Sequence, residues 1–190
     1  MRIKPLRIIA MLLAAIMCGC SDGHKNKAIP RREAYPRLEQ YAPQYTDIRI
    51  GQFSVPVNSS AIVDSITPEW TNVEYPRYGL TLHLTALKTP SETELANAVD
   101  NRLERMALNI GDKNAADTSF ITSAGLECVV VVSRDGIPTP IQFIAVESSG
   151  GILSGTVALK GKATPTDSIA PIIDAMAAEI DTLLRRTCLQ

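Results

Sequence analysis

The sequence of 190 residues contains few of the residue types that carry chemistry. It has two histidines, four cysteines and one tryptophan, and aromatic residues make up only 5% of the chain. The formal net charge is −1, and no basic stripe interleaved with aromatic residues is present, which argues against a nucleic-acid-binding protein. The zinc-protease motif, the nucleophile elbow and the glycine-rich phosphate loop are also missing. We therefore expect no enzymatic activity, no metal and no cofactor.

The sequence also lacks an apolar run long enough to cross a membrane. The run near the N-terminus covers residues 8–17. Ten residues rise only about 15 Å as a helix, whereas the hydrocarbon core of a bilayer is about 30 Å thick. Three basic residues precede the run, at Arg2, Lys4 and Arg7. A basic start followed by a short apolar segment is typical of a secretory signal peptide, which we predict over residues 1–19.

Two cysteines, Cys18 and Cys20, lie at the end of this segment. They make a poor metal site, because two further ligands at a suitable spacing are absent. Met17 and Gly19 before Cys20 instead resemble the bacterial lipobox, in which the signal is cut before the cysteine and its thiol is acylated. Cys18 fits this pattern less well, because the bulky Met17 would occupy the position that must be small. We predict that Cys20 is lipidated and becomes the first residue of the mature protein.

Cleavage before Cys20 would change the charge and the location of the protein. It removes three basic residues and no acidic one, which leaves 16 basic and 20 acidic residues, a formal net charge of −4. Acyl chains on Cys20 would hold the protein on the cell membrane or the outer membrane, since two or three chains anchor far better than one. Because no acidic run that might direct surface export follows the cysteine, we expect the domain to face the periplasm.

The mature chain is expected to begin with a leash over residues 20–46, followed by a single domain over residues 47–190. Closely spaced prolines favour extended chain in the leash. Its tyrosines allow two interpretations: they pack on the domain, or they form a partner-binding segment. The prolines are Pro30, Pro36 and Pro43, and the tyrosines are Tyr35, Tyr41 and Tyr45.

Within the domain, alternation of apolar and polar residues predicts several strands. Residues 78–88 alternate most clearly, and residues 126–133 are apolar on nearly both faces, which places that strand in the centre of a sheet with both faces covered. Residues 59–69 have no clear period. The short connections predict antiparallel pairing. Further strands are predicted over residues 47–57, 70–76, 118–124, 141–148 and 151–160.

Two segments change to the helical period. Ser91 and Glu94 have the spacing of a capping box, and an apolar stripe then continues to Ile110 before Gly111 ends it. A second amphipathic helix is predicted near the C-terminus, from about Thr166 to Arg186. Together these patterns predict an α+β fold, an antiparallel β-sheet meander with two amphipathic helices packed on it.

Candidate site residues are few. Trp70, Tyr75, Arg77 and Tyr78 have the composition of a protein-binding hot spot, although their rings could equally form one end of the core. His83 is expected to be an ordinary surface or helix-covered imidazole, and only carboxylates converging on it would indicate an enzyme. The remaining pair of cysteines, Cys128 and Cys188, could form a disulfide, but two separate thiols are the favoured reading.

Several segments together resemble a known family. They are "IPRREAYPRLE", "WTNVEYPRYGLTLHL", "PTPIQFIAVESSGGILSGTVAL" and "TDSIAPIIDAMAAEI", and they cover nearly the whole mature chain. In this order they resemble the gliding-motility lipoprotein family GldD, whose lipid-anchoring cysteine matches Cys20.

The resemblance implies a cell-envelope lipoprotein that supports gliding motility or the associated type IX protein secretion machinery through protein–protein contacts. It brings no enzymatic activity, cofactor or catalytic residue. The alternative function, from a different class, is a periplasmic module that binds a lipid or a peptide in a pocket between sheet and helix. An exposed aromatic patch would favour the first function, and a deep apolar pocket would favour the second.

Overall fold

Two helices and two antiparallel sheets make up the part of the chain that the computed structural model describes, which is residues 38–111, 114–161 and 166–190. The larger sheet has seven strands in the order β3-β4-β5-β9-β8-β7-β6, and the smaller has three in the order β1-β2-β10. The larger sheet is formed by β3 (Ile62–Ile66), β4 (Trp70–Tyr75), β5 (Leu80–Lys88), β6 (Ala115–Ile121), β7 (Glu127–Ser133), β8 (Ile141–Glu147) and β9 (Gly151–Leu159). The smaller is formed by β1 (Tyr45–Ile50), β2 (Phe53–Asn58) and β10 (Cys188–Leu189).

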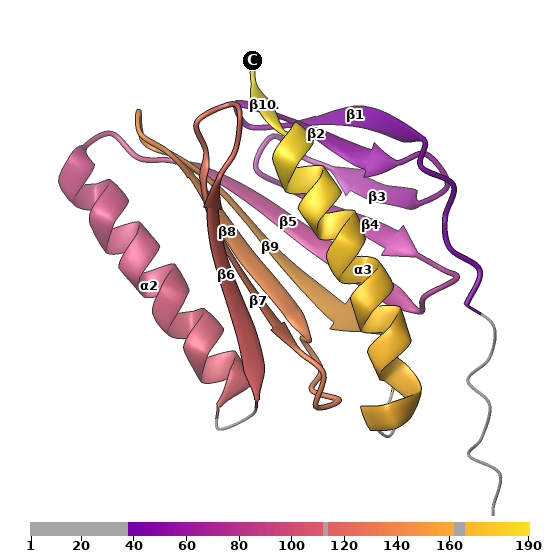
Figure 1. The fold of residues 1–190 in the computed structure, drawn as a ribbon. Coiled ribbons are helices and arrows are strands. Elements are labelled where there is room, and N and C mark those ends of the chain that lie inside the picture. The colour runs from indigo at the N-terminus through magenta and orange to yellow at the C-terminus, as the bar shows by residue number, and fades with distance from the viewer. Residues whose placement is uncertain (1–37, 112–113, 162–165) are drawn as a thin grey trace, which may run out of the picture. The chain divides into compact units, whose positions relative to one another are not determined.

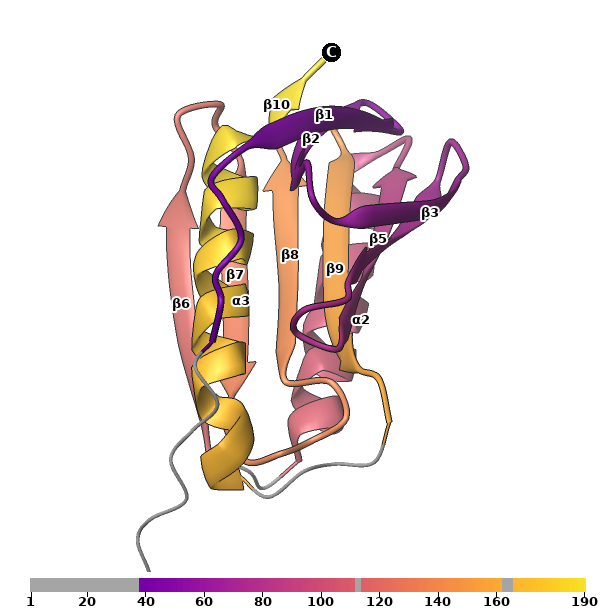
Figure 2. The same ribbon diagram turned by 90° about the vertical axis from the view of Figure 1, so that its right-hand side faces the viewer.

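The helices α2 (Glu92–Ile110) and α3 (Thr166–Arg186) cover opposite faces of the seven-stranded sheet (Figure 1). In the second view α3 lies in front of the strands and α2 behind them (Figure 2). All strand pairs are antiparallel. This arrangement confirms the predicted α+β fold. None of the helices in the described ranges is both long enough and apolar enough to cross a membrane.

The helix α2 begins and ends where the sequence predicts. The Ser91 side chain accepts a hydrogen bond from the Glu94 backbone N–H at 3.3 Å, so it satisfies one of the free N–H groups of the first turn. Gly111, with φ of 58°, ends the helix, and its N–H donates to the Ala107 carbonyl. The buried Gln142 amide joins the last turn to β8, because its oxygen accepts from the Asn109 amide at 2.9 Å.

The main core lies between α3 and the sheet. Ile173, Met176 and Ile180 of α3 are fully buried in it, against the inward-facing leucines of β5 and residues of β7, β8 and β9. The Phe143 ring lies over Gly155, where an added Cβ atom would come within 2.2 Å of the ring. A smaller apolar cluster on the other face joins Met106 of α2 to residues of β8 and β9. Both faces of the sheet are therefore packed, but by different helices.

The domain starts earlier than the boundary predicted at residue 47. Tyr41 is 6% exposed and lies in the main core, and Leu38 packs against it. The compact unit accordingly begins at Arg37. Burial of an aromatic ring stabilises the folded state, because it removes a large apolar area from water. The part of the predicted leash around Tyr41 is therefore held on the domain. Tyr41 and Tyr45 therefore follow the interpretation in which the tyrosines pack on the domain, whereas Tyr35 and Cys20 lie outside the described residues.

Three other expectations need correction. Residues 47–57 form two strands, because Gly51, with φ of 56°, turns the chain between them. Residues 59–69 contain β3, whose bulge near Asp64 interrupts the alternation that would have revealed it. The valine-rich β7 lies next to the sheet edge instead of in the centre. It is apolar on both faces because Cys128 and Val130 belong to the core on the α3 side, while Val129 and Val131 pack toward α2.

Candidate functional site

The four residues predicted to form a partner-binding surface lie at the two ends of β4. Trp70 begins the strand and is 43% exposed, whereas Tyr75 ends it and is 1% exposed. Arg77 and Tyr78 follow in the turn after Tyr75, and the Tyr78 side chain is buried. The structure therefore separates Trp70 from the other three, and they do not form one continuous surface.

The buried tyrosines hold the N-terminal part of the domain in place. The Tyr41 ring meets the rings of Tyr75 and Tyr78 edge-on, with centroids 5.6 and 4.9 Å apart. The Tyr41 N–H donates to the Tyr78 hydroxyl at 3.3 Å, and the Arg77 N–H donates to the Tyr41 hydroxyl at 3.1 Å. Burial raises the pKa of Tyr75 and Tyr78 above the ordinary value for tyrosine. These rings form one end of the core, which was the alternative interpretation of this segment.

Trp70 instead borders a hollow at the other end of β4 and β5, which we call the Trp70 hollow. Its volume is about 600 Å³. Leu87 is also 49% exposed there, so two large apolar side chains face water around one depression. Trp70 pairs with Thr85 across the two strands, and Leu87 follows Thr85 on the same face of β5. The lining residues are Gly51, Gln52, Phe53, Pro68, Glu69, Trp70, Thr85, Ala86, Leu87 and Lys88.

A second hollow, of about 530 Å³, lies between α2 and the sheet, and we call it the arginine hollow. It shares Thr85 and Leu87 with the Trp70 hollow, so the two depressions adjoin. The charged residues in its lining are Arg102 and Arg105, and no acidic residue lines it. The lining residues are Thr85, Leu87, Asn97, Ala98, Asn101, Arg102, Arg105, Ile152 and Ser154.

Packing fixes the Arg102 side chain in this hollow. Its Nη2 atom donates to the Thr156 hydroxyl at 2.8 Å and to the Gly155 carbonyl at 3.2 Å, which ties α2 to β9. Its Nε atom is buried and has no hydrogen-bond partner among the described residues. Burial, and next the positive charge of Arg105, lower the pKa of Arg102 below its ordinary value. The hollow therefore holds two neighbouring cations, one of them partly desolvated.

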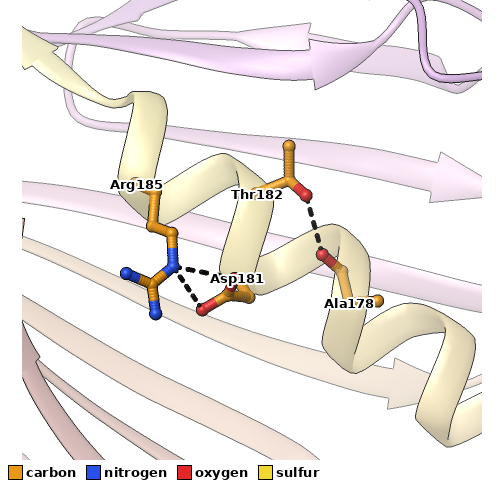
Figure 3. Close-up of polar contacts among 4 residues, drawn as sticks. All are labelled: Ala178, Asp181, Thr182 and Arg185. Atoms are coloured by element: carbon orange, nitrogen blue, oxygen red, sulfur yellow. Dashed lines mark hydrogen bonds and ion pairs between the residues drawn. The ribbon is translucent and has the colours of Figure 1, made fainter.

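Three basic side chains of the described residues are paired with carboxylates. On α3 the Arg185 Nε atom lies 2.9 Å from both carboxylate oxygens of Asp181, one turn earlier, and the nearby Thr182 hydroxyl donates to the Ala178 carbonyl at 3.0 Å (Figure 3). Arg134 and Lys160 form ion pairs with Asp174 and Glu74. Arg102 and Arg105 form no ion pair with any residue in the described ranges, and they lie together in one hollow whose lining has no acidic residue.

His83 and the other residues that could act in catalysis or metal binding do not come together in one site within the described ranges. His83 is exposed on β5, and its Nδ1 atom lies 2.6 Å from the Asn72 side-chain oxygen on β4. Among residues 38–111, 114–161 and 166–190, no three histidine, cysteine or acidic side chains are grouped as metal ligands would be. His83 is therefore a surface imidazole, in agreement with the plainer of the two interpretations.

The disulfide that was an alternative for Cys128 and Cys188 is not formed. Cys128 is buried on β7, where its Sγ atom lies 3.7 Å from the Leu126 carbonyl oxygen. Cys188 is exposed on β10, which belongs to the other sheet and pairs with β2. Both cysteines of the described residues are therefore free thiols.

Sequence reasoning did not single out Leu87, Arg102 and Arg105 as surface candidates. One signal was present for Leu87, because it follows Thr81, His83 and Thr85 on the polar side of its strand and breaks that pattern. Arg102 and Arg105 are three residues apart on α2 and so share a helix face. They border one hollow with Leu87 because α2 packs against β9. This packing could not be predicted from any local sequence pattern.

The comparisons with known proteins identify a family. The family model "Gliding motility lipoprotein GldD" matches residues 25–188, which is well over half of the chain. No curated protein sequence matches the chain. Among solved structures, the Ran-binding protein Mog1p of Saccharomyces cerevisiae is similar with a TM-score of 0.43 and 11% identity, over 77% of this chain and 95% of that chain. The α+β fold is given by the strands and helices of the chain itself.

The matched family consists of lipoproteins, which are held in the cell envelope by lipid, and it is associated with gliding motility. It agrees with the resemblance noted in the sequence and extends it from residue 25 to β10. We conclude that the chain belongs to the gliding motility lipoprotein GldD family.

Proposed function

We propose that the chain supports gliding motility, and the type IX secretion machinery associated with it, by contacting other envelope proteins. The observation that carries this proposal is the exposure of Trp70 and Leu87 around one hollow. An exposed tryptophan beside a leucine loses little conformational entropy and gains much apolar burial when a partner covers it. The Trp70 hollow is therefore the contact surface that the geometry supports best.

The proposal includes the lipid anchor. We propose that Cys20 carries the acyl chains and that residues after it connect the membrane to the domain, which faces the periplasm. Anchoring confines the domain to a layer near the bilayer, and this confinement raises its effective concentration toward membrane-bound partners. No enzymatic step is part of this function.

A second candidate function is the binding of a lipid or a free peptide. The volumes of the two adjoining hollows, about 600 and 530 Å³, support it, because ligand pockets of proteins have similar sizes. Both hollows are open depressions at the surface, whereas a carrier encloses most of its ligand. We therefore place this function second.

Photocrosslinking in cells distinguishes contact with an envelope protein from binding of a lipid or a free peptide. A photoreactive amino acid replaces Trp70, and in a control it replaces Leu108, which is 74% exposed on α2 and borders neither hollow. The proposal predicts that an envelope protein of the motility or secretion assembly is captured from position 70 and not from position 108. Capture of no protein, together with a lipid that co-purifies with the unmodified chain, would favour the second function.

A further inference from the structure

We propose that the arginine hollow binds a carboxylate side chain of an acidic peptide segment, while the adjoining Trp70 hollow takes an apolar side chain of the same segment. This inference rests on the proposed function, because it names the chemistry of the contact with the partner. The partner segment would carry a glutamate or aspartate near a large apolar residue.

The charge of the hollow supports an anionic ligand. Arg102 and Arg105 face the same space without an acidic residue in the lining and without an ion pair to a described residue. Two guanidinium groups at close range repel each other, and burial of one of them adds a desolvation cost. A bound carboxylate would offset both costs, since it would lie between two positive charges.

The hydrogen-bonding groups of the hollow suit a carboxylate. Arg102 has one nitrogen engaged with β9, and that contact fixes the direction of its planar guanidinium group. Arg105 is exposed on the next turn and is free to close on a ligand. Two arginines can meet the two oxygens of a carboxylate with charge-assisted hydrogen bonds, which are the stronger kind. The nearby Asn97, Asn101 and Ser154 supply further polar contacts.

Because the two hollows share lining residues, a segment that binds in one of them also meets the apolar side chains of the other. Thr85 and Leu87 border both depressions, so a segment that places an acidic side chain against the arginines passes next to Leu87 and Trp70. Both of those side chains are largely apolar and exposed. Covering them requires an apolar residue in the same segment.

A peptide fits this surface better than an anionic membrane or a nucleic acid. Membrane recognition by charge relies on clusters of about four to eight basic residues, whereas this hollow has two. The net charge of −4 expected for the chain after residue 19 would also repel phosphate-rich surfaces. A single carboxylate between two arginines needs neither a broad basic surface nor a positive net charge.

The test uses the full-length chain in a neutral detergent and measures binding of a fluorescent peptide that carries one glutamate beside a leucine and no other charged side chain. The same peptide with glutamine in place of glutamate is the ligand control. Arg105→Gln removes an exposed charge, and Arg102→Lys keeps the charge but loses the fork of the guanidinium group. Arg49→Gln, at an exposed arginine of β1 outside both hollows, is the matched protein control.

We expect the glutamate peptide to bind more tightly than the glutamine peptide. Arg105→Gln and Arg102→Lys should each weaken its binding about tenfold or more, the effect of losing a charged hydrogen bond, while Arg49→Gln should leave it unchanged. The inference is overturned if the unaltered chain does not bind the glutamate peptide at millimolar concentration, if both peptides bind equally, or if neither hollow variant weakens binding.

Displacement of the bound peptide by a soluble lipid distinguishes a peptide site from a site for a lipid headgroup. If dihexanoyl phosphatidylglycerol displaces the peptide at a lower concentration than unlabelled glutamate peptide does, the hollow is a lipid headgroup site and the inference is wrong. Failure of the peptide measurement leaves the motility function standing, since that function is read in cells that lack the chain. Normal gliding of such cells would refute the motility function whatever the peptide does.

Discussion

Cys128 and Cys188 show how burial sets the reactivity of a single residue. Cys128 is 2% exposed in the main core, and burial raises the pKa of its thiol to about 11. Because the thiolate is the reactive form, this cysteine is inert at neutral pH. Cys188 is exposed on the short strand β10.

Thiol labelling of the folded domain checks this difference. We expect maleimide at neutral pH to modify Cys188 rapidly and Cys128 only after unfolding in urea. Peptide mapping by mass spectrometry identifies the modified position. Rapid labelling of both cysteines without denaturant would show that β7 is not packed as described, and resistance of both thiols in the unfolded chain would indicate a disulfide.

Glu179 of α3 provides a test that depends on pH. It accepts a hydrogen bond from the Tyr45 hydroxyl at 3.3 Å, and burial raises the pKa of its carboxyl group. Folding therefore makes protonation of this carboxylate easier than it is in the unfolded chain. Its contribution to stability is fully present below the ordinary pKa of glutamate, 4.5, and is lost as the pH rises through the higher folded value. At neutral pH the buried charge of Glu179 destabilises the domain.

Replacement of this carboxyl group by an amide should remove the penalty. We expect Glu179→Gln to raise the free energy of unfolding at pH 7, while at pH 4 the variant and the unaltered protein should differ much less. Urea unfolding at the two pH values measures the effect, with the exposed Glu104→Gln as control. An equal effect of Glu179→Gln at both pH values would contradict the assigned burial of the charge.

At the scale of elements, the position of α2 decides whether the arginine hollow exists. The helix is held at its end by Gln142 and along its length by Arg102, and its first turn depends on the Ser91 cap. Its capping signals and apolar stripe are local in sequence, so its bounds could be predicted. The strand that it faces could not be predicted, because the order of strands in a sheet is set by long-range pairing.

The cap of α2 can be tested by itself. Ser91→Ala removes the acceptor for the Glu94 N–H and should lower the free energy of unfolding by about 1 kcal/mol. Thr93→Ala, in the same exposed first turn, is the matched control and should have little effect. Urea unfolding measures both variants. A loss for Thr93→Ala equal to that for Ser91→Ala would show that the cap adds nothing beyond helix propensity.

The turn regions show why other elements escaped prediction. The β1–β2 hairpin looked like a single strand, because Gly51 and Gln52 interrupt the alternation for only two residues. β3 is short and bulged, and β10 has two residues whose pairing with β2 depends on where α3 ends. These strands are determined by tertiary contacts, and the alternation of apolar and polar residues in their sequences is weak.

At the scale of the whole molecule, the fold class and family could be predicted, whereas the candidate surface could be predicted only in part. Trp70 was selected for its composition and is exposed, but the tyrosines selected with it are buried around Tyr41. Composition cannot separate a core aromatic cluster from a binding surface, because both use the same residues. Trp70 and Leu87 line one hollow, and Leu87 and the two arginines line the next, only when α2, β4 and β5 come together.

Membrane attachment through Cys20 is a prediction about the whole protein. Cys20→Ala should release the protein from the membrane fraction, because it removes the thiol that would carry the acyl chains. Sedimentation of cell membranes followed by immunoblotting measures the distribution. Cys18→Ala is the matched control and should leave the protein in the membrane fraction. Unchanged sedimentation of Cys20→Ala would refute the assigned lipidation site.

The most direct test of the account is complementation of cells that lack the chain, with surface spreading and secretion of surface proteins as the two readouts. The account predicts that deletion impairs spreading and that the unaltered chain restores it. A variant with Trp70→Ala and Leu87→Ser should not restore spreading even when it reaches the membrane at the same level, whereas Leu108→Ala should. Normal spreading and secretion after deletion, or full restoration by the double variant, would contradict the central claim that the protein acts through this surface.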